Sequence, residues 1–359
     1  MNGEIKSLTG IRGVAAVYVI LYHIMHYSTK IQFIKNGYIA VDLFFVLSGF
    51  IMTYTYKKQF IQSVSPANFL IFMNHRFSRI WPVYAFWMFY FMIFLTEKVN
   101  FSPIPLISNL LLIQNWGLAS PYVGPSWSVS VELATYLAFP FLCMSIFNRG
   151  KWFTLLAVTM SLFILVILAY SKELSIDWLQ HGYSGRMDII AYNNVGPVLR
   201  CLAGFTLGVV SWKLFDYMQK SFNTAQANIT TLVISVAIII SLSEVGFDVL
   251  TIVLFSLLIP SIGAKGSIIS KLLSCKPIYF LGVISYSMYI SHIIILALYK
   301  GYVNEFVSFA IKNAQYRSDA STFLSLLMII AVATLSYYAV EKPTRKLLRT
   351  SNKFVVATA

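Results

Sequence analysis

Apolar stretches of about 20 residues recur from near the start of the chain almost to its end, and this is the length that a helix needs to cross a bilayer. Hydrophobic residues make up 58% of the 359-residue sequence and charged residues only 11%, a composition that no soluble domain of this size requires. The bulk of the chain must therefore lie in lipid. We expect an all-α membrane protein that forms a single domain over residues 1–359.

Hydropathy predicts a bundle of ten transmembrane helices with both termini in the cytoplasm. The spans are expected at residues 8–28, 38–56, 80–96, 126–147, 152–170, 197–215, 229–243, 247–262, 277–299 and 322–341. The apolar segment Leu106–Ile113 is too short to cross, so we expect it to be interfacial or re-entrant. Most of the 27 Lys and Arg residues then fall in cytoplasmic segments, as the positive-inside rule requires. The first apolar run lacks a small-residue cleavage site, which indicates a retained span rather than a signal peptide.

The charge and cysteine patterns exclude several classes of function. The net charge of +14 is distributed over short loops between apolar segments and forms no basic and aromatic face, so we expect no nucleic-acid partner. The cysteines Cys143, Cys201 and Cys275 have neither paired nor metal-ligand spacing, so we expect neither a disulfide framework nor a metal site. The sequence also shows no internal repeat of the kind that marks many transporters.

Among the ionisable residues inside predicted spans, where an unpaired charge is costly and therefore marks a functional candidate, five stand out. They are His23, Asp42, Glu132, Arg200 and His292. The predicted orientation places all of them except Arg200 at similar depths in the outer half of the membrane. The hairpin between the first two spans is expected to bring Asp42 beside His23, and an aspartate that sets an imidazole tautomer makes a general base. A packing role for His23, or proton transport by the whole group, is the alternative.

Three arginines are expected at the cytoplasmic face. Arg76 and Arg79 are three residues apart, hence on one side of a helix, and Arg12 lies at the start of the first span. The planar guanidinium suits bidentate binding of phosphate, although positive-inside anchoring at lipid headgroups is the alternative for each residue. The 11 residues from Arg12 to His23 return to nearly the same helix face about 16 Å further along the axis, a distance close to the reach of a pantetheine arm.

Six segments together resemble the integral-membrane acyltransferase-3 family, whose bacterial members O-acetylate polysaccharides, lipopolysaccharide and related glycans. The segments are LTGIRGVAAVYVILYH, GYIAVDLFFVLSGFIM, RFSRIWPVY, GPSWSVSVELATYLAFP, LGVISYSMYISH and EKPTRK. They occur in this order over residues 8–346, so the resemblance covers nearly the whole chain. It implies ten spans in the bacterial inner membrane and a cytoplasmic acyl-CoA donor. Some relatives carry a fused extracytoplasmic esterase-like domain, and its absence here favours a lone transferase.

The candidate site residues are expected to divide between catalysis and substrate binding. The resemblance implies that Arg76 and Arg79 help to bind acyl-CoA and that Glu132 lines the acceptor site. Trp116 and Trp127 either stack on a sugar ring or belong to interfacial aromatic belts. We expect the catalytic residues to be His23 and Asp42, and the substrate-binding residues to be Arg12, Arg76, Arg79, Glu132, Trp127 and His292.

The expected reaction is transfer of an acetyl group from acetyl-CoA, a cosubstrate rather than a bound cofactor, to a sugar hydroxyl of a cell-surface or lipid-linked glycan. His23 would deprotonate that hydroxyl or, in a variant, carry the acetyl group itself. A proton-coupled transporter or glycan flippase that uses the same buried titratable residues is the main alternative, and it leaves the arginines unexplained. A membrane scaffold without chemistry explains least. The sequence leaves open the acceptor, the acyl length and the oligomeric state.

Overall fold

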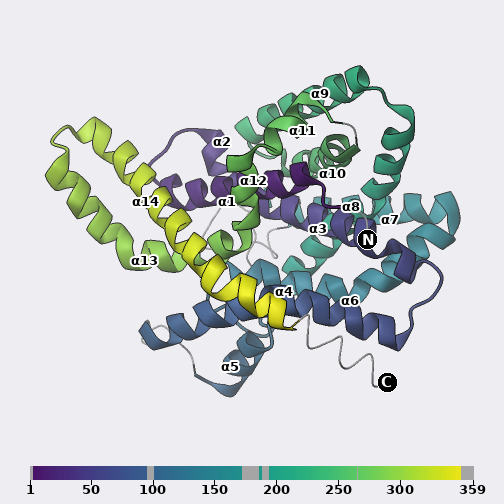
Figure 1. Ribbon diagram of the computed structural model, residues 1–359, viewed down its shortest axis with the longest axis horizontal. Helices are drawn as coiled ribbons and strands as arrows, with labels where there is room; N and C mark the ends of the chain where they lie inside the picture. The colour runs from purple at the N-terminus through teal and green to yellow at the C-terminus, as the bar shows by residue number, and fades with distance from the viewer. Residues whose placement is uncertain (1–2, 95–100, 172–185, 188–193, 265, 349–359) are drawn as a thin grey trace.

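The computed structural model describes residues 3–94, 101–171, 186–187, 194–264 and 266–348, and within these ranges the chain is helical with connecting turns (Figure 1). The elements are α1 (Lys6–Met25), α2 (Gln32–Lys35), η1 (Gly37–Ile39), α3 (Ala40–Phe60), α4 (Pro66–Phe94), α5 (Pro103–Leu110), α6 (Ser126–Asn148), α7 (Gly150–Tyr170), α8 (Gly196–Ser221), α9 (Thr224–Ser243), α10 (Asp248–Ala264), α11 (Ile268–Leu273), α12 (Lys276–Val283), α13 (Ser285–Ala310), α14 (Ala314–Ser336) and the π-helical turn η4 (Tyr337–Glu341).

Long apolar helices dominate this architecture, as predicted. Within the described ranges, eight helices are long and apolar enough to cross a membrane. The predicted spans 80–96 and 247–262 fall on α4 and on the 17-residue α10, which are not among these eight. The prediction of an all-α polytopic membrane protein is therefore confirmed, and the count of ten spans stays a prediction. The segment expected to be too short to cross forms the eight-residue α5 and the turn after it.

The ninth predicted span, 277–299, is wrong in its boundaries. The short helix α12 ends at Val283, and a separate helix, α13, runs from Ser285 to Ala310. Hydropathy cannot detect this break because apolar residues continue on both sides of it. The break places Ser285, Tyr289 and His292 in the N-terminal part of α13.

The bundle is arranged around α1 and α3. Figure 1 shows α1 and α3 near the middle of the bundle, α9, α10 and α11 on one side of them, and α4, α5 and α6 on the other. The hairpin of α13 and α14 extends away from the rest, so only the N-terminal part of α13 lies against the centre (Figure 1). The described helix continues through η4 to residue 348, which returns the C-terminal end of this helix to α4.

Helices α3 and α8 approach to backbone contact because glycines lie at their interface. A Cβ atom at Gly208 would lie 1.9 Å from the carbonyl oxygen of Val46, and one at Gly49 would lie 2.0 Å from that of Phe205. Small residues allow such close packing, which drives helix association in lipid. This contact places Asp42 on α3 opposite Arg200 on α8.

We expect Gly208→Ala to destabilise the protein by about 1–3 kcal/mol, because the added methyl overpacks a backbone contact. Gly263→Ala is the matched control, since a Cβ there meets the Phe215 ring at 3.5 Å, an ordinary contact. Thermal unfolding in one detergent measures both variants. Equal stability of the two would show that α3 and α8 do not depend on this approach.

Candidate functional site

A cavity of about 450 Å³ opens at the end of the bundle where α1 begins, and four arginines line it. Arg12 comes from α1, Arg76 and Arg79 from α4, and Arg345 from the helical turns after η4. The structure thus brings together the three arginines singled out in the sequence. It adds Arg345, which sequence reasoning missed although it lies in the quoted EKPTRK segment.

Arg76 shows most directly that this cavity suits an anion. Its side chain is 5% exposed, and its Nη2 donates to the hydroxyl of Tyr56 at 2.8 Å. Its Nε and Nη1 are buried and have no hydrogen-bond partner among the described residues. Buried donors on a charged group are costly when unpaired, so a phosphate reaching this end of the cavity would satisfy them.

Arg12 is held in a fixed place by the break between α12 and α13. Its Nη2 donates to the carbonyl oxygen of Gly282 and to the hydroxyl of Ser285, each at 3.1 Å. The Ser285 hydroxyl itself donates to the Gly282 carbonyl at 2.9 Å. The residues of the helix break therefore position the guanidinium, which a continuous ninth helix would not do.

A second cavity, of about 100 Å³, lies in the middle of the bundle and shares Arg12, Arg79 and Ile51 with the first. We call it the central cavity and the first one the arginine cavity. The α3 residues that line it are mostly apolar, and Glu132 on α6 adds a carboxylate. Glu132 was expected at the acceptor site, and the structure places it in the cavity that Arg12 and Arg79 also line. Because the two cavities share residues, a flexible ligand anchored in the first could extend into the second.

His23 and His292 form a close pair beyond the central cavity. Nε2 of His292 lies 3.3 Å from Nδ1 of His23, and their ring centroids are 4.9 Å apart. Tyr289 lines the central cavity, and its ring centroid lies 5.8 Å from that of His292. The histidine pair therefore adjoins the central cavity through Tyr289.

The backbone determines which nitrogen of each histidine carries its proton. Nδ1 of His23 lies 2.8 Å from the carbonyl oxygen of Val19, and Nδ1 of His292 lies 2.6 Å from that of Tyr289. A carbonyl oxygen can only accept, so both Nδ1 atoms must be protonated. The Nε2 of His292 then carries a lone pair directed at His23, and the Nε2 of neutral His23 is a free base.

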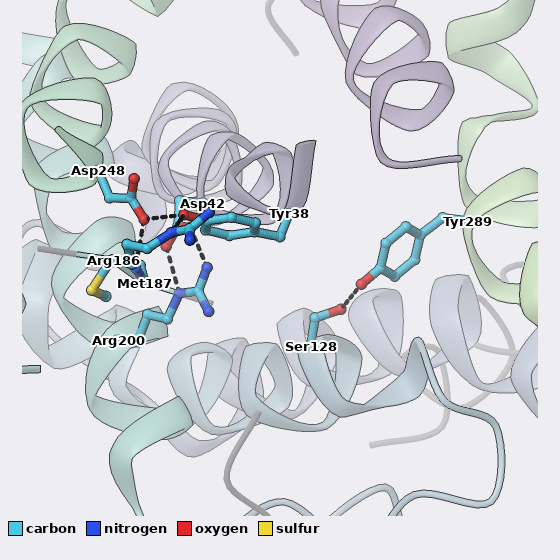
Figure 2. Close-up of polar contacts among 8 residues, drawn as sticks. All are labelled: Tyr38, Asp42, Ser128, Arg186, Met187, Arg200, Asp248 and Tyr289. Atoms are coloured by element: carbon cyan, nitrogen blue, oxygen red, sulfur yellow. Dashed lines mark hydrogen bonds and ion pairs between the residues drawn. The ribbon is translucent and has the colours of Figure 1, made fainter. Parts of the chain in front are cut away.

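The prediction that Asp42 pairs with His23 is wrong. Asp42 accepts from Nε of Arg200 at 2.9 Å and from its Nη2 at 2.5 Å, a bidentate ion pair shown in Figure 2. Both side chains are almost fully buried, at 0% and 2% exposure. The guanidinium fork binds both carboxylate oxygens, which an imidazole cannot do, and α8 packs directly on α3. The carbonyl of Val19 and the ring of His292 take the place expected for Asp42.

Trp127 belongs to the same buried cluster. It is 5% exposed, and the Arg200 guanidinium carbon lies 5.4 Å from its ring centroid. This is within the range of a cation–π contact. Trp116, the other candidate, donates from Nε1 to the carbonyl of Ser130 at 2.9 Å. Trp127 therefore lies inside the bundle rather than in an interfacial belt, and its contact with a sugar stays a prediction.

Two further buried carboxylates escaped sequence reasoning. Asp248 on α10 accepts from the Tyr38 hydroxyl at 2.7 Å and from the Met187 backbone nitrogen at 2.5 Å (Figure 2). Glu341 accepts from the Ser287 hydroxyl at 2.6 Å, and the positive charges of Arg12 and Arg79 stabilise its carboxylate. Glu341, like Arg345, lies in the quoted EKPTRK segment, whereas no motif marked Asp248. Across the described ranges, no group of three His, Cys, Asp or Glu residues could hold a metal ion.

Comparisons with known proteins match the chain to acyltransferases. A family model described as an acyltransferase domain matches residues 5–340. The chain is 22% identical over 369 residues to O-acetyltransferase OatA of Staphylococcus aureus, an alignment that covers 95% of this chain and 57% of the relative. It is 26% identical over 378 residues to peptidoglycan O-acetyltransferase OatA of Listeria monocytogenes, covering 95% and 56%.

A shorter match, 38% identical over 78 residues, is to protein 2 in the picA locus of Rhizobium radiobacter, and it covers 22% of this chain and 39% of that protein. No solved structure matches the chain. The chain thus spans little more than half the length of the two OatA proteins. The family model, in contrast, covers nearly all of it, as the six sequence segments predicted. This polytopic membrane protein belongs to the acyltransferase-3 family.

Proposed function

We propose that the protein transfers an acetyl group from cytoplasmic acetyl-CoA to a sugar hydroxyl of a cell-surface or lipid-linked glycan in the bacterial inner membrane. The observation that carries the proposal is the sequence of sites along the bundle: an arginine cavity, a central cavity that shares Arg12 and Arg79 with it, and a histidine pair beyond. The names of the relatives, O-acetyltransferase and peptidoglycan O-acetyltransferase, support a glycan acceptor.

The arginine cavity is suited to the nucleotide end of the donor. Its volume of about 450 Å³ lies within the range of small-molecule sites, and its four guanidinium groups match a ligand that carries several phosphates. The positive-inside rule places this end of the bundle in the cytoplasm, where acetyl-CoA is found. The narrower central cavity, of about 100 Å³, would then hold the thioester end of the pantetheine arm.

His23 would supply the base. Its Nε2 takes the proton of the sugar hydroxyl, the sugar oxygen attacks the thioester carbonyl carbon, and the carbon–sulfur bond breaks. The proton on His23 then passes to the departing sulfur, so that CoA leaves as a thiol. In the covalent alternative, Nε2 itself attacks the thioester carbonyl, the carbon–sulfur bond breaks and CoA leaves as a thiolate. The sugar oxygen then takes the acetyl group, the bond from Nε2 to the acyl carbon breaks, and the hydroxyl proton goes to the thiolate. This covalent mechanism predicts that acetylated protein accumulates when the acceptor is withheld, which mass spectrometry would detect.

A proton-coupled transporter is less well supported. A proton relay needs titratable groups that can change charge, and the buried Asp42 is instead neutralised by Arg200. A transporter also has no evident use for the unpaired donors of Arg76 beside a cavity. Purified protein in lipid nanodiscs, given labelled acetyl-CoA and soluble peptidoglycan fragments, should acetylate the fragments. A complete lack of both hydrolysis and transfer, with the protein folded, would contradict the proposal.

Arg76→Ala should weaken acetyl-CoA binding by about tenfold to hundredfold, because hydrogen bonds to charged groups contribute about 1.5–3 kcal/mol. Arg149→Ala is the matched control, since Arg149 is exposed at the turn between α6 and α7 and lines neither cavity. Equilibrium binding of labelled acetyl-CoA measures both. Equal affinity of the two variants would remove Arg76 from the donor site.

A further inference from the structure

Two hydroxyl groups meet where the central cavity approaches the histidine pair. The Oγ of Ser128 on α6 lies 2.8 Å from the hydroxyl oxygen of Tyr289 on α13, and both residues line the cavity (Figure 2). Figure 2 shows this pair set apart from the Asp42–Arg200 cluster, with the Tyr289 ring reaching from α13 toward α6. The proposed reaction has not yet used either group.

The direction of this hydrogen bond follows from the partners of Ser128. Its Oγ lies 3.1 Å from the carbonyl oxygen of Pro125, which can only accept. The single hydroxyl proton of Ser128 is therefore directed at Pro125, and its oxygen accepts the proton of Tyr289. The Tyr289 hydroxyl therefore donates to the uncharged hydroxyl oxygen of Ser128.

Other hydroxyls around the cavity are held more firmly. Ser285 donates to the carbonyl of Gly282 at 2.9 Å, and Tyr286 donates to the carbonyl of Ile80 at 2.6 Å. Redirecting either proton would leave a backbone carbonyl without that donor. Redirecting the proton of Tyr289 leaves only the Ser128 oxygen without a donor, and Ser128 keeps its own bond to Pro125. Tyr289 is therefore the better placed of these donors to turn toward a ligand.

The position of Tyr289 matches the position that the thioester would reach. Its hydroxyl is at the central cavity, while its backbone carbonyl accepts from Nδ1 of His292, which in turn contacts His23. One residue thus connects the cavity proposed for the thioester with the histidines proposed for proton transfer. A carbonyl carbon attacked on the side of His23 would develop its negative charge near the Tyr289 hydroxyl.

We propose that Tyr289 is a catalytic residue that donates its hydroxyl hydrogen bond to the carbonyl oxygen of the acyl thioester, and that Ser128 holds this donor until the thioester arrives. The inference rests on the proposed acetyl transfer. As the sugar oxygen attacks, the carbonyl π electrons move to oxygen, and the Tyr289 O–H stabilises that oxyanion without giving up its proton. When the carbonyl re-forms, the carbon–sulfur bond breaks and the O–H returns to Ser128.

Substitution of the two partners of this hydrogen bond should lower kcat to different extents. Tyr289→Phe keeps the ring and removes the donor, so kcat for acetylation of peptidoglycan fragments should fall about 10²-fold, the effect of losing one oxyanion donor. The KM for acetyl-CoA should stay within about twofold, because the bond to the thioester replaces the one to Ser128 and therefore adds little to ground-state binding. Ser128→Ala removes only the resting acceptor and leaves the Tyr289 donor in place, so its loss of kcat should be much smaller than that of Tyr289→Phe.

Each alternative has its own outcome in nanodiscs. Equal losses in Tyr289→Phe and Ser128→Ala, or full activity in Tyr289→Phe, would overturn the assignment of Tyr289. A large fall in the melting temperature of Tyr289→Phe, alongside the fall in kcat, would show that the hydrogen bond stabilises the fold. This result would also overturn the catalytic assignment of Tyr289. Absence of acetyl-CoA-dependent acetylation in the unchanged protein would instead contradict the proposed function itself.

Discussion

Replacing His23 by alanine should lower acetyl transfer by about 10²- to 10⁴-fold, the contribution of a positioned general base. The substitution removes the Nε2 lone pair that the Val19 carbonyl makes available by holding the proton on Nδ1. Acetyl-CoA should still bind, because the arginine cavity lies at the other end of the route. Initial rates with labelled acetyl-CoA, together with donor affinity, measure the two effects separately.

His26→Ala is the matched control for this prediction. His26 follows on the same helix as its C-cap residue, and its backbone N–H bonds to the Tyr22 carbonyl, a bond that alanine keeps. Its substitution should leave transfer within a few-fold of the unchanged protein. Substantial transfer by His23→Ala, or an equal loss in His26→Ala, would sink the assignment of His23 as the base.

The second large effect is expected at the buried ion pair. Removing one partner, by Asp42→Ala or Arg200→Ala, leaves an uncompensated buried charge and should destabilise the protein by about 3–5 kcal/mol. The double variant Asp42→Leu/Arg200→Met replaces both charges by apolar groups and should recover most of that loss. Thermal unfolding in detergent measures all three.

The exposed pair between Lys220 and Asp216 provides the control. Its atoms are 2.6 Å apart, like those of the buried pair, but the side chains are 71% and 41% exposed. Asp216→Ala should therefore cost less than about 1 kcal/mol. If the double variant at Asp42 and Arg200 is as unstable as either single variant, the ion pair is not the source of the effect.

Activity of the double variant separates the two roles considered for Asp42. If Asp42 oriented His23, as the sequence suggested, the double variant would be folded and inactive. The structure instead gives that orientation to Val19 and His292, so a folded double variant should retain acetyl transfer. Asp42 and Arg200 thus stabilise the fold, whereas Val19 and His292 orient the catalytic base.

Sequence alone determined the class of fold and singled out four residues that line the two cavities, namely Arg12, Arg76, Arg79 and Glu132. The length of the apolar stretches indicated membrane helices, because the bilayer imposes one length on every span. The 11-residue interval from Arg12 to His23, and the three-residue interval from Arg76 to Arg79, depend only on helix geometry. The six ordered segments indicated the family, which the family model confirms over residues 5–340.

Only the tertiary structure decided which of these residues are partners. Asp42 and Arg200 are 158 positions apart, and His23 and His292 are 269 apart, so no local pattern relates them. Their pairing depends on which helices touch, and that depends on glycine contacts such as Gly208 on Val46 and on the break before Ser285. Hydropathy reports how deep a residue lies in the membrane. It carries no information on the neighbouring helix that a side chain faces, and that neighbour decides whether a buried carboxylate neutralises an arginine or orients a histidine.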